Sequence, residues 1–286
     1  MRALNVDVDD ALFARWVAWF SPAVQPFLAD ADLASSLGEH ESGASLSDEV
    51  RDTYCMYELP AGLQYVWLSE AQFSALPRPR RAALVRAQRT FDRGLVPRVK
   101  SWVGVLGDQA REQADGHRFV WWPSLLEGCE EQVLRDYIEE GRRASRHDEV
   151  SEHVWTSAAR TLPAARGIAG TFASASGPNC FGTVMAAAGV VDADTVWMQR
   201  EPFERWLSQQ TRPGGEDAEP GTVLVWRSPD GLVQHAAVTL GEGWALHKPS
   251  QGWMSPNKIL TTAECKVSSR AAGRRLVRHT ILALCT

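Results

Sequence analysis

The apolar positions of the first 150 residues recur mostly at helical spacing. Asp9 and Asp10 precede an apolar stripe that runs to Phe20, which predicts a helix with acidic residues at its start. Ser69-Glu70-Ala71-Gln72 has the form of a capping box and predicts a second, short helix. The N-terminal region is therefore expected to be mixed and mainly helical.

The pattern changes in the second half of the chain. The run from Phe181 to Ala188 is compatible with a helix, and Gly189 is a good stop for it. Apolar runs beyond it predict strands near residues 222–226, 233–240, 243–248 and 276–284. Helices first and a sheet afterwards predict a compact α+β domain. We place the domain boundary after residue 150, with residues 1–150 as one domain and residues 151–286 as the other.

A helix is also expected over residues 80–93, and it carries basic residues outside its apolar stripe. Arg78, Arg86, Arg89 and Arg93 would share roughly one face, which could hold an acidic ligand. A solvated or salt-bridged face is the commoner outcome. Residues 119–122, Phe-Val-Trp-Trp, predict a short aromatic strand or wall in a core, with a ligand shelf as the alternative.

One cysteine and two histidines carry the chemistry of the sequence. Cys180 follows Gly177-Pro178-Asn179 at the start of the predicted helix, where the helix dipole favours a thiolate. His235 opens a strand that turns at residues 241–243, and His247 ends the next strand. Paired antiparallel strands can bring the two rings side by side, within roughly 5 Å. The arrangement predicts a nucleophile, its base and a residue that orients the base.

The roles follow from the chemistry that such a site needs. An imidazolium at His235 would add a second charge that lowers the pKa of the Cys180 thiol. A polar neighbour such as His247 would fix the tautomer of the base. The backbone N–H of Cys180 and one further donor, Asn179 or a loop amide, would hold an oxyanion. Phe181 and Trp244 are candidates for contact with an apolar part of a substrate.

These residues resemble the NlpC-type cysteine peptidases, a papain-like bacterial family that cleaves amide bonds in cell-wall peptides. The segments that carry the resemblance are Asn-Cys-Phe-Gly at 179–182, Pro-Gly-Thr-Val-Leu-Val at 220–225 and His-Ala-Ala-Val-Thr-Leu-Gly-Glu-Gly at 235–243. It covers roughly residues 151–286 and implies Cys180 as nucleophile, His235 as base and His247 as the third group. It also implies a papain-like domain in which the nucleophile helix packs on an antiparallel sheet.

The chain departs from the family pattern beside the nucleophile. Asn179 stands where the family has an Asp, and Phe181 stands where it has a Ser. In the family those positions help to bind a free amino end. We therefore expect neutral or acylated amides to be better substrates than peptides with a free amino end.

Composition narrows the function classes. The net charge of −5 gives no reason to expect a nucleic-acid partner. The five cysteines form no Cys-x-x-Cys pair and no evident disulfide framework, and the six-residue spacing of His147 and His153 does not favour a metal. No signal peptide or membrane span is evident, so a cytoplasmic location is expected.

The sequence therefore predicts a cysteine peptidase or amidase that works through an acyl-enzyme on a small peptide or amide. It predicts no cofactor and no metal. An acyltransferase that uses the same thiol intermediate is one alternative, and a binding module without catalysis is another.

Overall fold

The computed structural model describes residues 1–37, 41–42 and 45–282. The chain divides into two compact units. The N-terminal unit is Asp9–Tyr137, and the C-terminal unit combines Ile138–Thr286 with Met1–Val8. Residues 138–150 and the first eight residues thus group with the second half of the chain, whereas the sequence suggested a division after residue 150. The architecture is mixed α+β with antiparallel sheets, as predicted at that level.

The N-terminal unit combines an antiparallel sheet of order β3-β5-β4 with short helices. Its first helix begins as predicted, because the Asp9 carboxylate caps it by accepting a bond from the N–H of Leu12. The capping box at Ser69 is also present. The elements are α1 (Asp10–Phe20), β3 (Val24–Ala29), α2 (Ala31–Ser36), β4 (Glu41–Ser42), α3 (Asp48–Tyr54), β5 (Gln64–Ser69), α4 (Glu70–Ala75), α5 (Arg78–Thr90), α6 (Val99–Leu106), α7 (Gln109–Glu112) and α8 (Pro123–Leu126).

Two predictions for this unit need correction. Helix α5 ends at Thr90, so Arg93 is not on it and is instead buried. The other three arginines of the predicted face are exposed, and Arg89 pairs with Asp92 at 3.0 Å, which matches the solvated alternative. Residues 119–122 form no strand, and all four side chains are buried in core packing, so they offer no ligand shelf.

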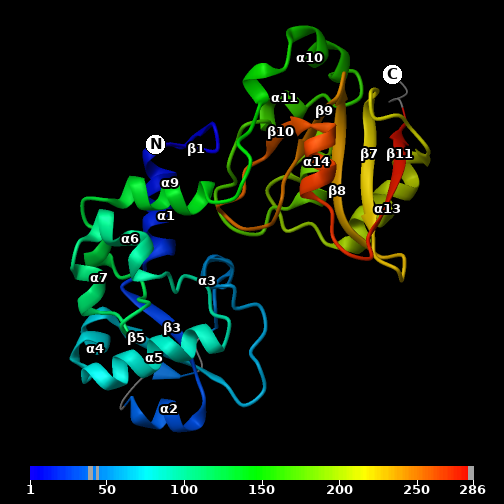
Figure 1. Cartoon of the computed structure of the whole chain (residues 1–286). Coiled ribbons are helices and arrows are strands. Elements are labelled where there is room, and N and C mark those ends of the chain that lie inside the picture. The colour runs from blue at the N-terminus through cyan, green and yellow to red at the C-terminus, as the bar shows by residue number, and fades with distance from the viewer. Residues whose placement is uncertain (38–40, 43–44, 283–286) are drawn as a thin grey trace. The chain divides into compact units, whose positions relative to one another are not determined.

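The C-terminal unit is built on a six-stranded antiparallel sheet of order β10-β9-β8-β7-β11-β6 (Figure 1). Helix α9 (Glu130–Glu139) runs across the division between the units. The remaining elements are β1 (Arg2–Ala3), β2 (Val6–Asp7), a 3₁₀ turn (His147–Glu149), α10 (Glu152–Ala158), α11 (Ala165–Ile168), α12 (Cys180–Ala187), α13 (Arg200–Gln210), β6 (Thr211–Pro213), β7 (Pro220–Arg227), β8 (Val233–Gly241), β9 (Trp244–His247), β10 (Lys258–Thr261), α14 (Thr262–Ser268) and β11 (Arg275–Ile281).

The four predicted strands are therefore present as β7, β8, β9 and β11. The last two residues of the strand predicted over 276–284 lie outside the described residues. Helix α12 begins at the predicted residue, Cys180. Within the described part of the chain, no helix is both long and apolar enough to cross a membrane.

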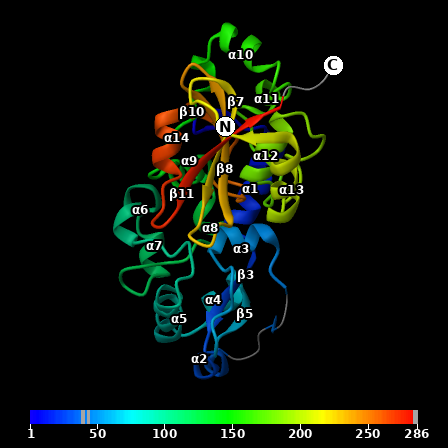
Figure 2. The same ribbon diagram turned by 90° about the vertical axis from the view of Figure 1, so that its right-hand side faces the viewer.

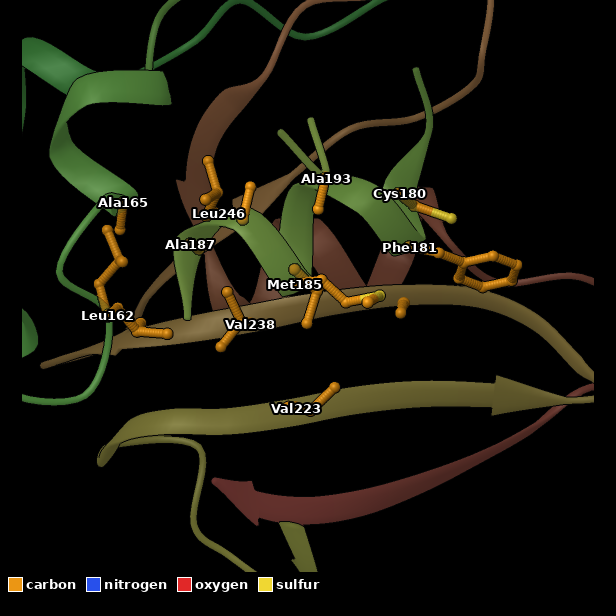
Figure 3. Packing of buried hydrophobic residues seen from close by; sticks show 14 of the residues in the cluster. Leu162, Ala165, Cys180, Phe181, Met185, Ala187, Ala193, Val223, Val238 and Leu246 are labelled. Carbon is orange, nitrogen blue, oxygen red and sulfur yellow. The ribbon is translucent and has the colours of Figure 1, made fainter. Parts of the chain in front are cut away.

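Helices cover both faces of this sheet. Helices α12 and α13 lie against one face and α14 lies against the other (Figure 2). On the α12 face, Val238 of β8 and Val223 of β7 pack with Met185 of the helix in the large core cluster (Figure 3). On the α14 face, Ala237 of β8 packs with Cys265 of α14 in a smaller cluster. Successive residues of β8 thus alternate between the two cores, as the pleat of a strand requires.

The first eight residues complete the C-terminal unit. Strands β1 and β2 pair with each other, and Ala3 and Val6 are fully buried. The Leu4 N–H donates to Glu139 Oε1 at 2.8 Å, and the Leu4 carbonyl accepts from the Ser145 N–H at 2.8 Å. The start of the chain is therefore held by the segment that leads into the sheet.

Candidate active site

Cys180 occupies the first position of α12 because Asn179 caps that helix. The Asn179 side-chain oxygen accepts bonds from the N–H groups of Phe181 and Gly182, each at 3.1 Å. Its amide nitrogen donates to the Met198 carbonyl at 2.8 Å. The next turn of the helix needs glycine, since a Cβ at Gly182 would lie 2.1 Å from the Ala193 carbonyl oxygen. Local sequence therefore fixes where the thiol sits.

The sulfur is almost fully buried, at 8% exposure for the residue. Burial raises the pKa of the Cys180 thiol to about 11. Hydrogen bonds from the backbone N–H groups of Ala236, Phe181 and Cys180 itself oppose that shift without overcoming it. The expectation that the helix start lowers the net pKa of this thiol is therefore wrong for the unliganded protein, because desolvation of the sulfur outweighs the donors around it.

His235 and His247 meet as predicted. His235 Nε2 lies 3.3 Å from His247 Nδ1, and the ring centroids are 5.1 Å apart at 74°. The register pairs Val238 with Leu246, so His247 is a diagonal neighbour of His235 across the ladder. Both residues are buried, at 6% and 1% exposure. His247 Nε2 is buried without a hydrogen-bond partner among the described residues.

Both rings are neutral near neutral pH. Burial, followed by the charge of Arg274, lowers the pKa of His235 to about 4. Burial, followed by the charges of His235 and Lys258, lowers the pKa of His247 well below its usual value. An imidazolium at His235 is therefore not available to activate the thiol in advance, contrary to expectation, because the sheet and its covering side chains exclude water from the ring.

The sulfur and the His235 ring approach β8 from different sides. His235 pairs with Trp226, whose ring centroid lies 5.3 Å away and which belongs to the core on the α14 face. Cys180 belongs to the core on the α12 face and meets the strand at the N–H of Ala236, the residue after His235. The two groups are neighbours along the strand, but the contacts of the described residues include no hydrogen bond between them.

Sequence reasoning missed a buried lysine beside the thiol. The β8–β9 ladder includes the pair Val238 and Leu246, and Lys248 follows two residues later, one residue past the end of β9. Lys248 is 1% exposed, its ammonium donates to the Ser255 carbonyl, and its charge acts to lower the pKa of the Cys180 thiol. The sequence could have predicted the direction of this side chain. Successive residues of a strand point to opposite faces, so the residue after His247 is expected on the α12 face.

Two of the three residues expected to meet the substrate or its oxyanion are used elsewhere. Both ends of the Asn179 amide are engaged as described above, so it is not a spare donor. Phe181 is buried and stacks on Phe203, with centroids 4.6 Å apart, so it is part of the core. Trp244 starts β9 whereas His247 ends it, and its ring packs under the guanidinium of Arg146 at 4.9 Å. The assignments of Asn179 and Phe181 are corrected, because helix capping and core packing take these side chains. The assignment of Trp244, which is half-buried, stays a prediction.

The loop after β9 is tied to the start of α12. Thr183 Oγ1 donates to Asn257 Oδ1 at 2.7 Å, and Asn257 Nδ2 donates to Thr171 Oγ1 at 3.2 Å. The Trp253 N–H donates to Ser176 Oγ at 3.2 Å. These bonds join three segments that are distant in the sequence and hold the Cys180 loop against the lysine loop.

The comparisons give no match for this chain among family models, curated proteins or solved structures. Among the described residues, His, Cys, Asp and Glu side chains form no group of three or more that could hold a metal ion. The site is therefore interpreted from its own geometry.

Proposed function

We propose that the protein is a cysteine amidase or peptidase whose nucleophile is Cys180 and whose base is His235, in a papain-like arrangement of the NlpC type. The observation that carries the proposal is the hydrogen bond between His235 Nε2 and His247 Nδ1. It occupies one ring nitrogen of His235 and leaves Nδ1 for the thiol. Among the described residues, the fully buried polar atoms without a hydrogen-bond partner include His247 Nε2 but not His235 Nδ1.

The proposal assigns a definite tautomer to the pair. For Nδ1 of His235 to accept a proton, its Nε2 must carry one and donate to His247 Nδ1. His247 then carries its own proton on Nε2. His247 orients the base and accepts the hydrogen bond that stabilises it once it is charged.

The chemistry starts from neutral groups. His235 Nδ1 takes the thiol proton as the sulfur attacks the carbonyl carbon of a bound amide. The Cys180 N–H donates to the oxyanion that forms. When the C–N bond breaks, His235 returns the proton to the leaving amine, and a thioester remains. A water molecule, deprotonated by His235, then attacks the thioester and releases the acid and the free thiol.

The sulfur and the ring must come into contact in the substrate-bound state. Catalytic hydrogen bonds are often long or absent in unliganded enzymes and form in the complex. Because the sulfur lies on the α12 side of β8 and the His235 ring lies on the α14 side, contact between them requires the backbone at the start of β8 to move as well as the side chain.

The test is capture of the acyl-enzyme. Cys55 is exposed and would react with simple alkylating reagents, so the experiment uses a Cys55→Ser background. The protein is incubated with a panel of small activated esters and amides, and tryptic peptides are weighed. We expect an acyl adduct on Cys180 that is lost in His235→Gln. Acylation of Cys129 or Cys265 with none on Cys180 would overturn the proposal, as would adduct formation that does not depend on His235.

A further inference from the structure

A cavity of about 510 Å³ lies in the N-terminal unit, and a second cavity has Trp226, the neighbour of His235, in its wall. The second cavity has a volume of about 500 Å³ and opens on the α14 face of the sheet. Its apolar lining includes Trp226, Val267 and Leu276, and its polar lining is basic: Lys266, Arg270 and Arg274. None of the described residues that line it is acidic. This concentration of positive charge is local, because the whole chain has a net charge of −5.

The two arginines of this cavity are available to a ligand, whereas the lysine is engaged. Lys266 pairs with Asp217, which also binds Arg278 at 2.9 Å. Arg270 and Arg274 are exposed, and the described residues offer neither of them an ion-pair partner. Unpaired guanidinium groups on the wall of a cavity match a carboxylate in charge and in the geometry of its two oxygens.

The cavity borders the proposed base. Trp226 forms part of its wall, and the indole centroid lies 5.3 Å from the centroid of the His235 ring. Arg274 acts electrostatically on His235. Two ionisable side chains therefore act on the His235 ring: Arg274, from the turn before β11, and His247, from β9.

We propose that this cavity is a binding site for a small ligand with a carboxylate attached to an apolar or aromatic group, with the carboxylate on Arg270 and Arg274 and the apolar part against Trp226. The cavity lies on the α14 face and Cys180 lies on the α12 face, so this is a ligand site beside the base of the proposed function and not the place of the reacting amide. A bound carboxylate would also neutralise Arg274 and so remove a charge that opposes protonation of His235. Binding of the acidic group would thereby help the base to take the thiol proton.

Direct binding tests this without turnover. Benzoate serves as the probe, benzamide as its uncharged counterpart and inorganic phosphate as a second anion. Titration calorimetry is carried out on the full chain carrying Cys180→Ala, so that a failure of the catalytic proposal does not affect the measurement. We expect benzoate to bind at least about tenfold more tightly than benzamide, the difference that one charge-assisted pair supplies.

The double variant Arg270→Gln, Arg274→Gln should weaken benzoate binding by about tenfold or more. Arg275→Gln is the matched control. It is the exposed neighbour of Arg274 and does not line the cavity, so it should leave the affinity within about twofold of the parent. Equal binding of benzoate and benzamide would overturn the proposal. So would benzoate binding that survives the double variant, or tighter binding of phosphate than of benzoate.

Discussion

Each unit of this protein encloses a cluster of polar side chains, and the two clusters differ in how completely their hydrogen bonds are satisfied. In the N-terminal unit, Arg93 donates to the Pro26 carbonyl at 3.0 Å, to the Gly94 carbonyl at 3.3 Å and to the Gln25 side-chain oxygen at 2.6 Å. Its guanidinium also lies 4.0 Å from the centroid of the Tyr54 ring. The buried cation is thus held by both hydrogen bonds and an aromatic face.

The cluster around His235 in the C-terminal unit is built differently. Among the described residues, His247 Nε2 is sealed without a partner, the thiol is buried at a raised pKa, and no hydrogen bond joins the thiol to the base. Buried polar groups usually satisfy their hydrogen bonds, and an incomplete cluster costs stability. The arginine cluster therefore serves the fold, whereas the histidine cluster contains the unsatisfied polar groups that the proposed reaction would use.

Replacement of the proposed base should have the largest effect. His235→Gln should reduce amide hydrolysis by at least about 100-fold, because the thiol loses its proton acceptor. The thermal midpoint should change little, since glutamine fills much of the same space. His153→Gln, at an exposed histidine of the same unit, is the control and should retain wild-type turnover. Full activity in His235→Gln would show that the histidine cluster is structural after all.

Arg93→Met should show the reverse behaviour. Removing the guanidinium leaves the Pro26 carbonyl and the Gln25 side-chain oxygen buried without a donor, and we expect a loss of about 3 kcal/mol in the free energy of unfolding. Urea unfolding followed by circular dichroism measures it. Arg89→Met, on the exposed face of α5, is the matched control and should be neutral within error. An equally small effect of both variants would contradict a structural role for Arg93.

The pH dependence of stability should report the buried base. The pKa of His235 is about 4 in the folded protein, against the ordinary histidine value of 6.5 that applies to the unfolded chain. Between these values the unfolded state binds a proton that the folded state does not. Stability contributed by the neutral ring is therefore present above pH 6.5 and declines as the pH falls to about 4, by about 3 kcal/mol.

Urea midpoints measured at a series of pH values across that range test the prediction. His235→Gln should lose part of the slope, and the His247 contribution should remain. The Arg89→Met variant should reproduce the wild-type slope. If wild type and His235→Gln respond identically to acid, the ring is not buried in its neutral form.

The smallest expected effect concerns Lys248. Its charge favours the thiolate, so Lys248→Met should raise the pKa of Cys180 further and slow its acylation at about pH 8 several-fold. Lys248→Arg keeps the charge and should recover part of the rate. The readout is the pH profile of acylation in the Cys55→Ser background, which a purely structural role would not shift. An unchanged profile in Lys248→Met, with the protein folded, would remove the lysine from the site.

Sequence reasoning succeeded where the determinants are local. The helix start at Cys180 follows from Asn179 and the small residues after it, and the contact between His235 and His247 follows from two strands joined by a short turn. The sulfur environment could not be foreseen in the same way. Its burial depends on how α12 meets β8, which brings together residues more than about 50 positions apart. Lys248 is an intermediate case, since strand parity gives its face but not its burial.

Arg93 is a second residue whose burial the sequence pattern did not predict. Helical spacing placed it on a face with three exposed arginines, but the helix ends at Thr90 and the chain then turns. Asp92 adopts a positive φ of 57°, and the next residue enters the core. A helix end set by a residue in the left-handed region is decided by small energy differences in the local sequence, which the apolar stripe does not record.

The pairing of residues 1–8 with the segment after α9 makes the N-terminal unit an insertion within the C-terminal one. During vectorial synthesis the ribosome releases residues 1–8 first, and their binding partners follow only after the whole N-terminal unit has been made. The C-terminal unit therefore cannot close until late in translation. A fragment that starts at residue 151 would also lack β1, β2 and the segment whose Arg146 N–H donates to the Ile259 carbonyl at 2.8 Å. A shortened chain that joins residue 8 directly to residue 138 would still contain every residue of these pairings.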